Sequence, residues 1–209
     1  MFNINFKNIG FIQTKLPNKV LSRLNTYTKQ KNKKKTNYRL AGNINASYDL
    51  IDKDNFFFNK VLCPHINQYA KNYVDVVPKI LTKNCKFRLD RFWVNYQKKH
   101  EFNPNHNHGG IFSFVIWIKI PSSYKKESKL PFASHANSSH PNTFQFTYID
   151  ALGKVRYDNH NLEPEDEGTM LFFPAGLNHC VYPFYLSNQY RISISGNIAI
   201  DPTEIVQNV

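Results

Sequence analysis

The sequence predicts a mainly β protein of the jelly-roll type with helices at its N-terminal end. The spacing of apolar residues changes from three or four positions before residue 86 to every second position after it. Short clusters of Gly, Pro and Asn separate the strand-like segments. No helical pattern alternates with these segments, which favours a β-sandwich or barrel over a parallel α/β sheet.

Residues 1–85 are expected to form an N-terminal helical elaboration. A first helix is predicted over 17–28, where a proline suits the first turn; its apolar residues, three and four apart, are Val20, Leu21, Leu24 and Tyr27. A second helix is predicted over 54–74, and Pro64 should kink it or delay its start. Amphipathic helices of this kind usually pack against a sheet. We therefore expect both to support the β core.

Residues 86–209 are expected to form the jelly-roll core, within one compact domain overall. The predicted strands are 87–97, 111–120, 143–149, 169–173 and 190–199. Turns are predicted at 103–104, 109–110, 151–154 and 174–176. Residues 121–142, rich in Ser, Lys, His and Pro, have the composition of a loop or lid.

Composition narrows the class of protein. With 17 Phe and 12 Tyr the chain is too aromatic to be disordered. The formal net charge of +12 is compatible with nucleic-acid binding, but no groove-reading helix or stacking motif accompanies it, so no nucleic acid is expected as a partner. The three cysteines form no Cys-x-x-Cys motif, which fits a reducing compartment. Neither a signal peptide nor a membrane span is recognisable, so we expect a cytoplasmic protein.

Three histidines are candidate metal ligands. His106 and His108 are two apart in an extended segment, so both imidazoles should point to one face. Taken alone, this pair is more typical of exposed polar residues in a loop. His179 ends the string Gly-x5-Pro-x-Gly-x2-His over 168–179, in which glycine and proline shape a turn that presents the histidine. Together the three predict a metal site, and imidazole suits iron, copper, nickel and zinc.

An arginine and a serine follow on one face of the last predicted strand. Arg191 comes twelve residues after His179, and Ser193 is two further on. Ile192 and Ile194 should point to the opposite face and into the core. A buried arginine needs a partner, and a carboxylate is the best one. That carboxylate can come from a ligand or from an Asp or Glu of the protein.

Two amides on another predicted strand are further candidates. Asn95 and Gln97 share a face with Trp93. They could donate hydrogen bonds to a cosubstrate or to metal-bound water. The alternative is that they belong to an exposed strand face.

These segments resemble the Fe(II)/2-oxoglutarate-dependent oxygenase superfamily, and most of all the oxygenases found in marine phages and bacteria. The segments that carry the resemblance are 92–97, 105–117 and 169–195, within a match over about 86–200. The resemblance implies a double-stranded β-helix core that binds Fe(II) through His-x-Asp/Glu and a distal histidine. It also implies that 2-oxoglutarate chelates the iron while its far carboxylate meets Arg191 and Ser193. The activity implied is a dioxygenase that uses O2, hydroxylates a substrate, and releases succinate and CO2. If the chain is phage-encoded, the compartment is the cytoplasm of the host cell.

The sequence departs from this superfamily at one ligand. The carboxylate expected two residues after His106 is replaced by His108, so we predict His106, His108 and His179 as the catalytic iron ligands. Three neutral ligands would leave the complex one positive charge higher than two histidines and a carboxylate. Two alternatives are a halide at that position, as in iron halogenases with His-x-Gly, and a carboxylate from elsewhere such as Glu101.

Two other classes of protein remain as alternatives. The string over 168–179 also resembles the second motif of cupins, which share the jelly roll, although the glutamate of the first motif is missing. A three-histidine cupin-type dioxygenase would need metal and O2 but no 2-oxoglutarate. A non-catalytic jelly-roll binding module would need neither. The substrate, a small molecule or a peptide, is not identified by the sequence, and neither is the oligomeric state.

Overall fold

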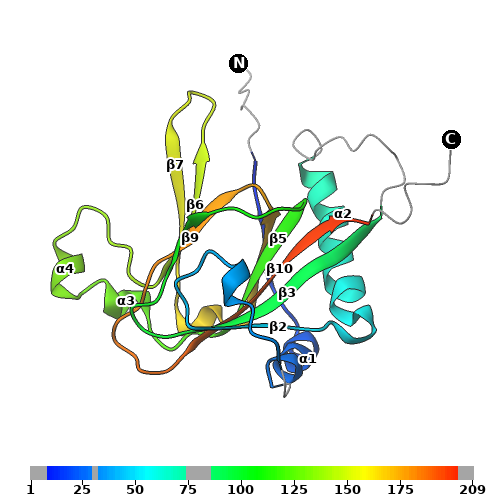
Figure 1. Cartoon of the computed structure of the whole chain (residues 1–209). Coiled ribbons are helices and arrows are strands. Elements are labelled where there is room, and N and C mark those ends of the chain that lie inside the picture. The colour runs from blue at the N-terminus through cyan, green and yellow to red at the C-terminus, as the bar shows by residue number, and fades with distance from the viewer. Residues whose placement is uncertain (1–8, 30–32, 74–85, 202–209) are drawn as a thin grey trace.

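The computed structural model describes residues 9–29, 33–73 and 86–201 of the chain (Figure 1). Two antiparallel sheets enclose a core, with strand orders β1-β8-β5-β10-β3-β2 and β4-β9-β6-β7. The larger sheet contains β1 (Ile12–Lys15), β2 (Ala46–Asp49), β3 (Phe87–Gln97), β5 (Phe112–Lys119), β8 (Thr169–Pro174) and β10 (Arg191–Ile200). The smaller sheet contains β4 (Asn103–His106), β6 (Thr143–Ile149), β7 (Val155–Asn161) and β9 (Asn178–Val181).

From β3 onward the chain crosses repeatedly between the two sheets. Strands β3, β5, β8 and β10 belong to the larger sheet, and β4, β6, β7 and β9 to the smaller one. Successive strands therefore lie in opposite layers, except in the β6–β7 hairpin, and this is the arrangement of a jelly roll. The predicted fold class is confirmed. Each of the five predicted strands is present, with both ends within one residue of the prediction.

Three further strands of the jelly roll were not predicted. The four-residue strands β4 and β9 are too short to show a period of two, and β4 includes the Asn-Pro pair expected to form a turn. Strand β7 is an edge strand that is mostly exposed, so it has no buried face to mark it in the sequence. Residues 121–142, expected to be a loop, contain the short helices α3 (Tyr124–Glu127) and α4 (Pro131–Ser134).

Helices α1 (Asn18–Thr28) and α2 (Cys63–Asn72) pack against the outer face of the larger sheet (Figure 1). Their buried residues join those of the sheet in one cluster; the helical members include Leu24, Tyr27, Ile66 and Tyr69. The predicted packing of N-terminal helices on the core is confirmed. The same part of the chain also supplies β1 and β2, the two edges of the larger sheet. The pattern did not predict these strands, because four residues are too few to establish a period.

The second helix is irregular where Pro64 disturbs it. It begins at Phe56, because Asp54 and Asn55 have positive φ angles of 59° and 50°. A π-helical segment, η3 (Phe58–Leu62), then precedes α2, whose first turn contains Pro64. Proline has no N–H and its ring clashes with the carbonyl four residues earlier, so a widened turn accommodates it. The last predicted residue, Val74, lies outside the described residues.

A single aspartate caps the N-terminal end of this helix. The Asp52 carboxylate accepts hydrogen bonds from the N–H groups of Phe57 (2.9 Å) and Phe58 (2.8 Å) and from the Tyr27 hydroxyl (3.1 Å). We expect Asp52→Ala to lower the free energy of unfolding by about 2–3 kcal/mol, measured by chemical denaturation. Asp54→Asn is the matched control, because that carboxylate is 90% exposed and pairs with Arg23 at 3.5 Å, and asparagine tolerates the positive φ of this residue. It should cost about 0.5 kcal/mol or less. Equal losses in the two variants would contradict the capping role.

The larger sheet is buried on both faces, and this explains the continuous apolar run in β5. Phe112, Phe114 and Ile116 point outward to the helices, whereas Val115 and Trp117 point inward to the smaller sheet. The inward cluster also includes Phe144, Phe146, Leu171 and Phe173. Beside it, the inner faces of β3 and β10 carry polar side chains, and these enter the site described below.

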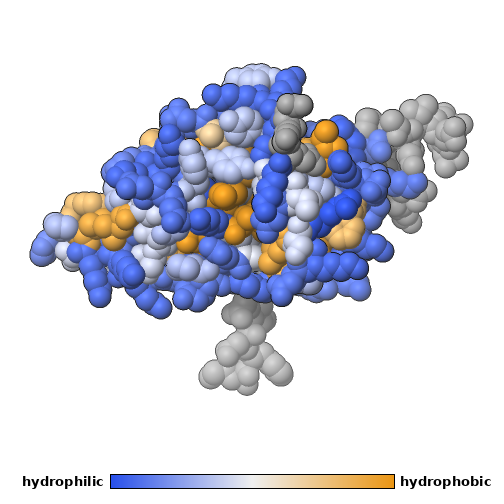
Figure 2. Space-filling view, turned by 90° about the horizontal axis from the view of Figure 1, so that it is seen from below, coloured by the Kyte–Doolittle hydropathy of each residue, from blue (hydrophilic) through white to orange (hydrophobic). Residues whose placement is uncertain are grey.

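The remaining short elements are the 3-10 helices η1 (Asn37–Arg39), η2 (Lys53–Asn55) and η4 (Pro164–Asp166). Seen from below, the surface is mostly hydrophilic, with hydrophobic residues in the middle of the face and at its left end, near α4 (Figure 2). Phe132 in α4 is 59% exposed. Among the described residues no helix has the length and apolar character needed to cross a membrane.

Candidate metal and cosubstrate site

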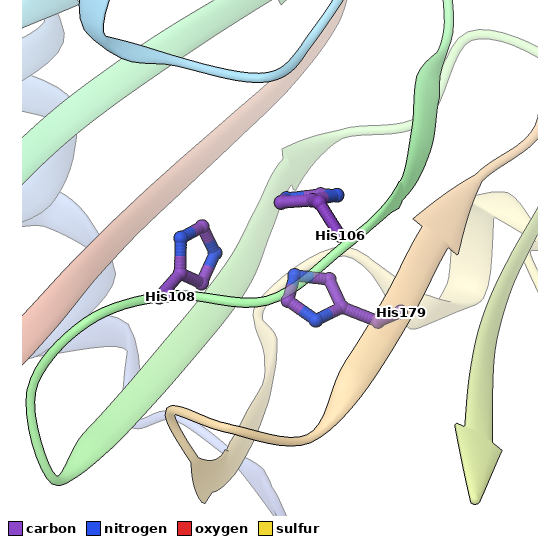
Figure 3. Close-up of side chains that lie close together, drawn as sticks. All are labelled: His106, His108 and His179. Atoms are coloured by element: carbon purple, nitrogen blue, oxygen red, sulfur yellow. The ribbon is translucent and has the colours of Figure 1, made fainter.

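Three histidines converge between the two sheets. His106 at the end of β4 and His179 in β9 are direct cross-strand partners, and their ring centroids are 4.3 Å apart. His108 follows in the loop after β4, and its N–H donates to the carbonyl of Ala175 (2.9 Å). Its ring lies 4.9 Å from that of His106 and 5.0 Å from that of His179. One ligand nitrogen of each residue lies within 4.8 Å of the others, and the rings face one another (Figure 3).

The predicted turn before His179 is present. The N–H of Leu177 donates to the carbonyl of Pro174 (3.0 Å), which closes a tight turn between β8 and β9. The chain passes there from the larger to the smaller sheet. The turn therefore brings His179 opposite His106, although the two are 73 residues apart in sequence.

Backbone carbonyls orient two of the imidazoles. Nδ1 of His106 lies 2.7 Å from the carbonyl oxygen of Pro104, and Nδ1 of His179 lies 2.9 Å from that of Leu177. A carbonyl oxygen can only accept, so Nδ1 carries the proton in both rings and Nε2 keeps its lone pair. This is how metal-binding histidines are usually held, with one nitrogen fixed by a hydrogen bond and the other free for the ion.

Burial keeps all three imidazoles neutral. It lowers the pKa of His179 to about 3 and the pKa of His108 to about 4, and it also lowers the pKa of His106. Positive charge on His106 acts as a second cause for the other two histidines, and Arg91 lowers the pKa of His108 further. Neutral imidazole is the form that binds a metal. The cluster is therefore ready to bind a cation at neutral pH.

Glu101, one alternative source of a carboxylate ligand, is engaged elsewhere. Its carboxylate accepts hydrogen bonds from the backbone N–H and the side-chain amide of Asn45 (3.1 and 2.8 Å) and from the N–H of Lys98 (2.8 Å). Among the described residues, the group that could hold an ion consists of the three histidines alone. The donor set is thus three neutral nitrogens.

All seven residues predicted to form the site line one cavity between the sheets. They are His106, His108, His179, Asn95, Gln97, Arg191 and Ser193. The cavity contains about 670 Å³ of space that no atom fills, counting the part open to solvent. Aromatic walls come from Trp93, Trp117, Phe144 and Phe173. The segment after η1 closes another side with Leu40, Ala41, Gly42 and Ile44, a role that no sequence pattern indicated.

Arg191 is buried in this cavity without a carboxylate. It is 1% exposed, and its hydrogen-bond partners are all neutral. Nε and Nη2 donate to Oε1 of Gln97 (3.1 and 2.9 Å), Nη1 to Oδ1 of Asn142 (2.8 Å), and Nη2 also to the carbonyl of Tyr182 (2.8 Å). Burial lowers the pKa of Arg191 to about 9, against a smaller raising effect of Glu127. Among the described residues, no Asp or Glu forms an ion pair with it.

The two amides predicted on β3 have definite partners. Gln97 holds Arg191 and also donates to the backbone carbonyl of Glu101. Oδ1 of Asn95 accepts from the hydroxyl of Ser47 in β2 (2.7 Å), so both amides are buried rather than exposed. Ser193 lines the cavity two residues beyond Arg191 on the same face, while Ile192 and Ile194 pack on the helical side, as predicted.

Sequence reasoning missed two groups that hold Arg191. Asn142 has a positive φ of 55°, and its amide nitrogen donates to the carbonyls of Ser122 and Leu162 (both 2.8 Å). Tyr182 contributes through its backbone carbonyl. A backbone carbonyl leaves no trace in the residue type, and Asn142 lay at the end of the segment expected to be a loop. Its asparagine identity, suited to positive φ, was the available signal.

A comparison with models of protein families shows which family the chain belongs to. A model of the family described as "Putative 2OG-Fe(II) oxygenase" matches residues 91–197, which is more than half of the chain. The chain belongs to this family. All seven predicted site residues lie within the segment that matches this 2OG-Fe(II) oxygenase family.

Among solved structures, a prolyl-4-hydroxylase from Pseudomonas putida is similar, with a TM-score of 0.53 and 13% sequence identity over 91% of this chain and 92% of that one. At this identity the likeness shows the fold alone. An oxidoreductase of the 2OG-Fe(II) oxygenase family from Burkholderia pseudomallei matches with a TM-score of 0.45 and 13% identity, over 91% of this chain and 85% of that one. No curated protein matches the chain.

The residues present fit the groups that the family implies. Three imidazole nitrogens that face one another suit Fe(II), and a buried guanidinium without an anionic partner suits one carboxylate of 2-oxoglutarate. This 2OG-Fe(II) oxygenase family member still differs from the expected ligand set, because the position that the resemblance assigns to a carboxylate is His108.

Proposed function

We propose that the chain binds Fe(II) through His106, His108 and His179, binds 2-oxoglutarate beside it, and uses O2 to hydroxylate a substrate. The reaction would consume one O2 and one 2-oxoglutarate for each substrate C–H bond, and would release succinate, CO2 and the alcohol. The observation that supports this best is that Arg191, hydrogen-bonded only to neutral groups, lies in the same cavity as three converging neutral histidines. Burying a charge without a counter-ion is costly, so the cavity favours an anionic ligand.

The iron, when bound, would supply the activation of O2, which no side chain can provide. The protein's part is to bind and orient. Nε2 of His106 and Nε2 of His179 are available as ligands because their Nδ1 atoms are already bonded to carbonyls. The rings of Phe144 and Phe173 pack against His179 at 5.5 and 5.0 Å between centroids. These rings would exclude water from the buried side of the metal.

Arg191 would bind the distal carboxylate of 2-oxoglutarate. A guanidinium has five N–H donors, and four are engaged by Gln97, Asn142 and Tyr182. The fifth, on Nη1, can donate to a carboxylate, and Gln97 can give up its place to a stronger acceptor. Ser193 would add a hydroxyl donor from the same strand face. Asn95 and Gln97 would orient the cosubstrate or water at the metal.

The strand register supports one ligand spanning both ends of the cavity. The ring of Trp93 meets that of His108 at 5.7 Å between centroids, and Gln97 holds Arg191. Trp93 and Gln97 are four residues apart in β3, which corresponds to about 13 Å along the backbone. The arginine and histidine side chains shorten this span as they reach into the cavity. A five-carbon dicarboxylate bound to the metal at one end would bridge the rest.

Cosubstrate turnover tests the proposal directly. The chain is loaded anaerobically with Fe(II), mixed with 2-oxoglutarate labelled at its first carbon, and then exposed to O2. We expect labelled CO2 and succinate in equal amounts, even without the primary substrate, at a slow uncoupled rate. A three-histidine dioxygenase of the cupin type would consume O2 with a suitable substrate and form no succinate. If the iron-loaded chain releases neither product across a broad panel of small molecules and peptides, the proposed function is wrong.

A further inference from the structure

A second group of cations lies on the outer side of the histidines. Arg39 and Arg91 line a hollow together with His106, His108 and Asn197, which we call the arginine hollow. It contains about 820 Å³ of atom-free space, counting the part open to solvent. Both arginines are exposed, unlike Arg191. The hollow therefore offers positive charge next to the histidine cluster from the solvent side.

A β-bulge directs Arg91 into this hollow. In the pairing of β3 with β10, Asn197 is opposite Arg91 but Ile198 is opposite Leu89, so Asp90 is an extra residue. Leu89 and Phe92 both pack in the core with the helices, although they are three residues apart. The bulge thus places Arg91 on the inner face of β3, in the same row of side chains as Trp93 and Gln97. Bulges commonly re-aim a side chain next to a functional site.

Among the described residues, the two arginines of the hollow have no acidic partner. Asp90, the one carboxylate among its lining residues, pairs with Arg88 at 2.6 Å. Arg39 packs over the ring of Tyr38 at 5.0 Å. Within the described ranges, no ion pair joins either Arg39 or Arg91 to an acidic side chain. Arg91 is also close enough to His108 to contribute to the lowering of its pKa.

We infer that the arginine hollow binds an oxyanion, a carboxylate or phosphate group, of the primary substrate and so holds that substrate beside the metal. This rests on the proposed function only in calling the bound molecule the substrate. Along β3 the histidine contact at Trp93 lies between Arg91 on one side and Gln97, which holds Arg191, on the other. The buried arginine suits the small cosubstrate, and the exposed pair suits a larger molecule that enters from solvent.

The first experiment needs neither iron nor turnover. The metal-free full chain, labelled with 15N, is titrated with inorganic phosphate while the side-chain N–H resonances of its arginines are recorded. Phosphate should shift the resonances of Arg91 and Arg39. Arg91→Gln and Arg39→Gln should each bind phosphate about tenfold more weakly, because a charge-assisted hydrogen bond is lost. Asp90→Asn should bind it more tightly, since a negative charge leaves the hollow.

The matched control is Arg156→Gln. Arg156 carries the same charge on the β7 hairpin, pairs with Asp150 at 2.7 Å, and does not line the hollow. Its substitution should leave phosphate affinity unchanged at fixed ionic strength. If Arg91→Gln and Arg39→Gln bind phosphate like the wild type, the inference is overturned. An equal loss in Arg156→Gln would also overturn it, because the effect would then be that of net charge.

A second arm uses the chain loaded with Fe(II) and 2-oxoglutarate. Small carboxylic acids and phosphate esters, acidic peptides, and the neutral amides and alcohols that match them are tested for stimulation of 2-oxoglutarate consumption. The anionic compounds should stimulate 2-oxoglutarate consumption, and Arg91→Gln should raise the KM for these compounds about tenfold. Stimulation by free acids or by peptides identifies the source of the oxyanion. Equal stimulation by neutral partners would overturn the inference. If the chain consumes no 2-oxoglutarate at all, the proposed function is wrong. The phosphate titration would still show whether the arginine hollow binds an oxyanion.

Discussion

Replacing His179 with alanine should reduce Fe(II) affinity by about a hundredfold or more. His179 is the most deeply buried of the three histidines, at 4% exposed, and its Nε2 is free because Nδ1 is bonded to the carbonyl of Leu177. The two histidines that remain, His106 and His108, come from one short segment and cannot enclose an ion by themselves. Anaerobic titration calorimetry with Fe(II), repeated with Mn(II) in air, measures the loss.

Three companion variants separate ligand loss from a packing defect. His160→Ala removes another histidine of the same sheet that also packs against Phe144 and Phe146 but lies outside the cluster. It should keep wild-type metal affinity. His108→Asp should also retain binding, because it supplies a carboxylate where the superfamily has one, whereas His108→Ala should not. Wild-type affinity in His179→Ala, or an equal loss in His160→Ala, would show that the cluster is not the metal site.

The histidine cluster could be predicted from the sequence because each of its parts is encoded locally. The alternation of an extended chain places His106 and His108 on one face, and a Gly/Pro turn presents His179. What local spacing cannot show is that β4 and β9 are neighbours. That pairing follows from the jelly-roll topology, so the convergence of the three rings became a prediction only through the fold class.

The wall of the cavity formed by residues 40–44 could not be predicted in this way. The segment is irregular and has no period, and it is held by contacts over long distances in sequence. The N–H of Asn43 donates to the carbonyl of Phe102 (2.8 Å), and just after the segment the N–H of Asn45 donates to the carboxylate of Glu101 (3.1 Å). Backbone groups make most of these contacts, and their positions depend on the finished fold. Two of the three groups around Arg191 were equally hard to predict, because Asn142 and the carbonyl of Tyr182 come from segments that only the fold brings to it.

Arg191→Ala should lower kcat/KM for 2-oxoglutarate by about a hundredfold or more while Fe(II) binding survives. The guanidinium is the one group in the cavity that can neutralise the distal carboxylate, among the residues described there. It is paired only with neutral acceptors, so an incoming anion relieves the cost of its burial. Succinate formation at varied 2-oxoglutarate concentration gives the kinetic loss, and Fe(II) titration shows whether the metal site is intact.

Arg191 also holds Gln97, Asn142 and Tyr182, so a purely structural role must be distinguished from binding. Arg191→Lys keeps the charge but loses the planar fork, and it should recover part of the activity, whereas Ser193→Ala should cost less than tenfold. Ligand-induced stabilisation provides the second readout, because a ligand at a hundred times its Kd adds about 2.7 kcal/mol to stability. In the presence of metal, 2-oxoglutarate should raise the Tm of the wild type strongly, that of Arg191→Lys weakly, and that of Arg191→Ala not at all. A structural arginine would lower the Tm of its variants equally with and without 2-oxoglutarate, and that result would refute the assignment.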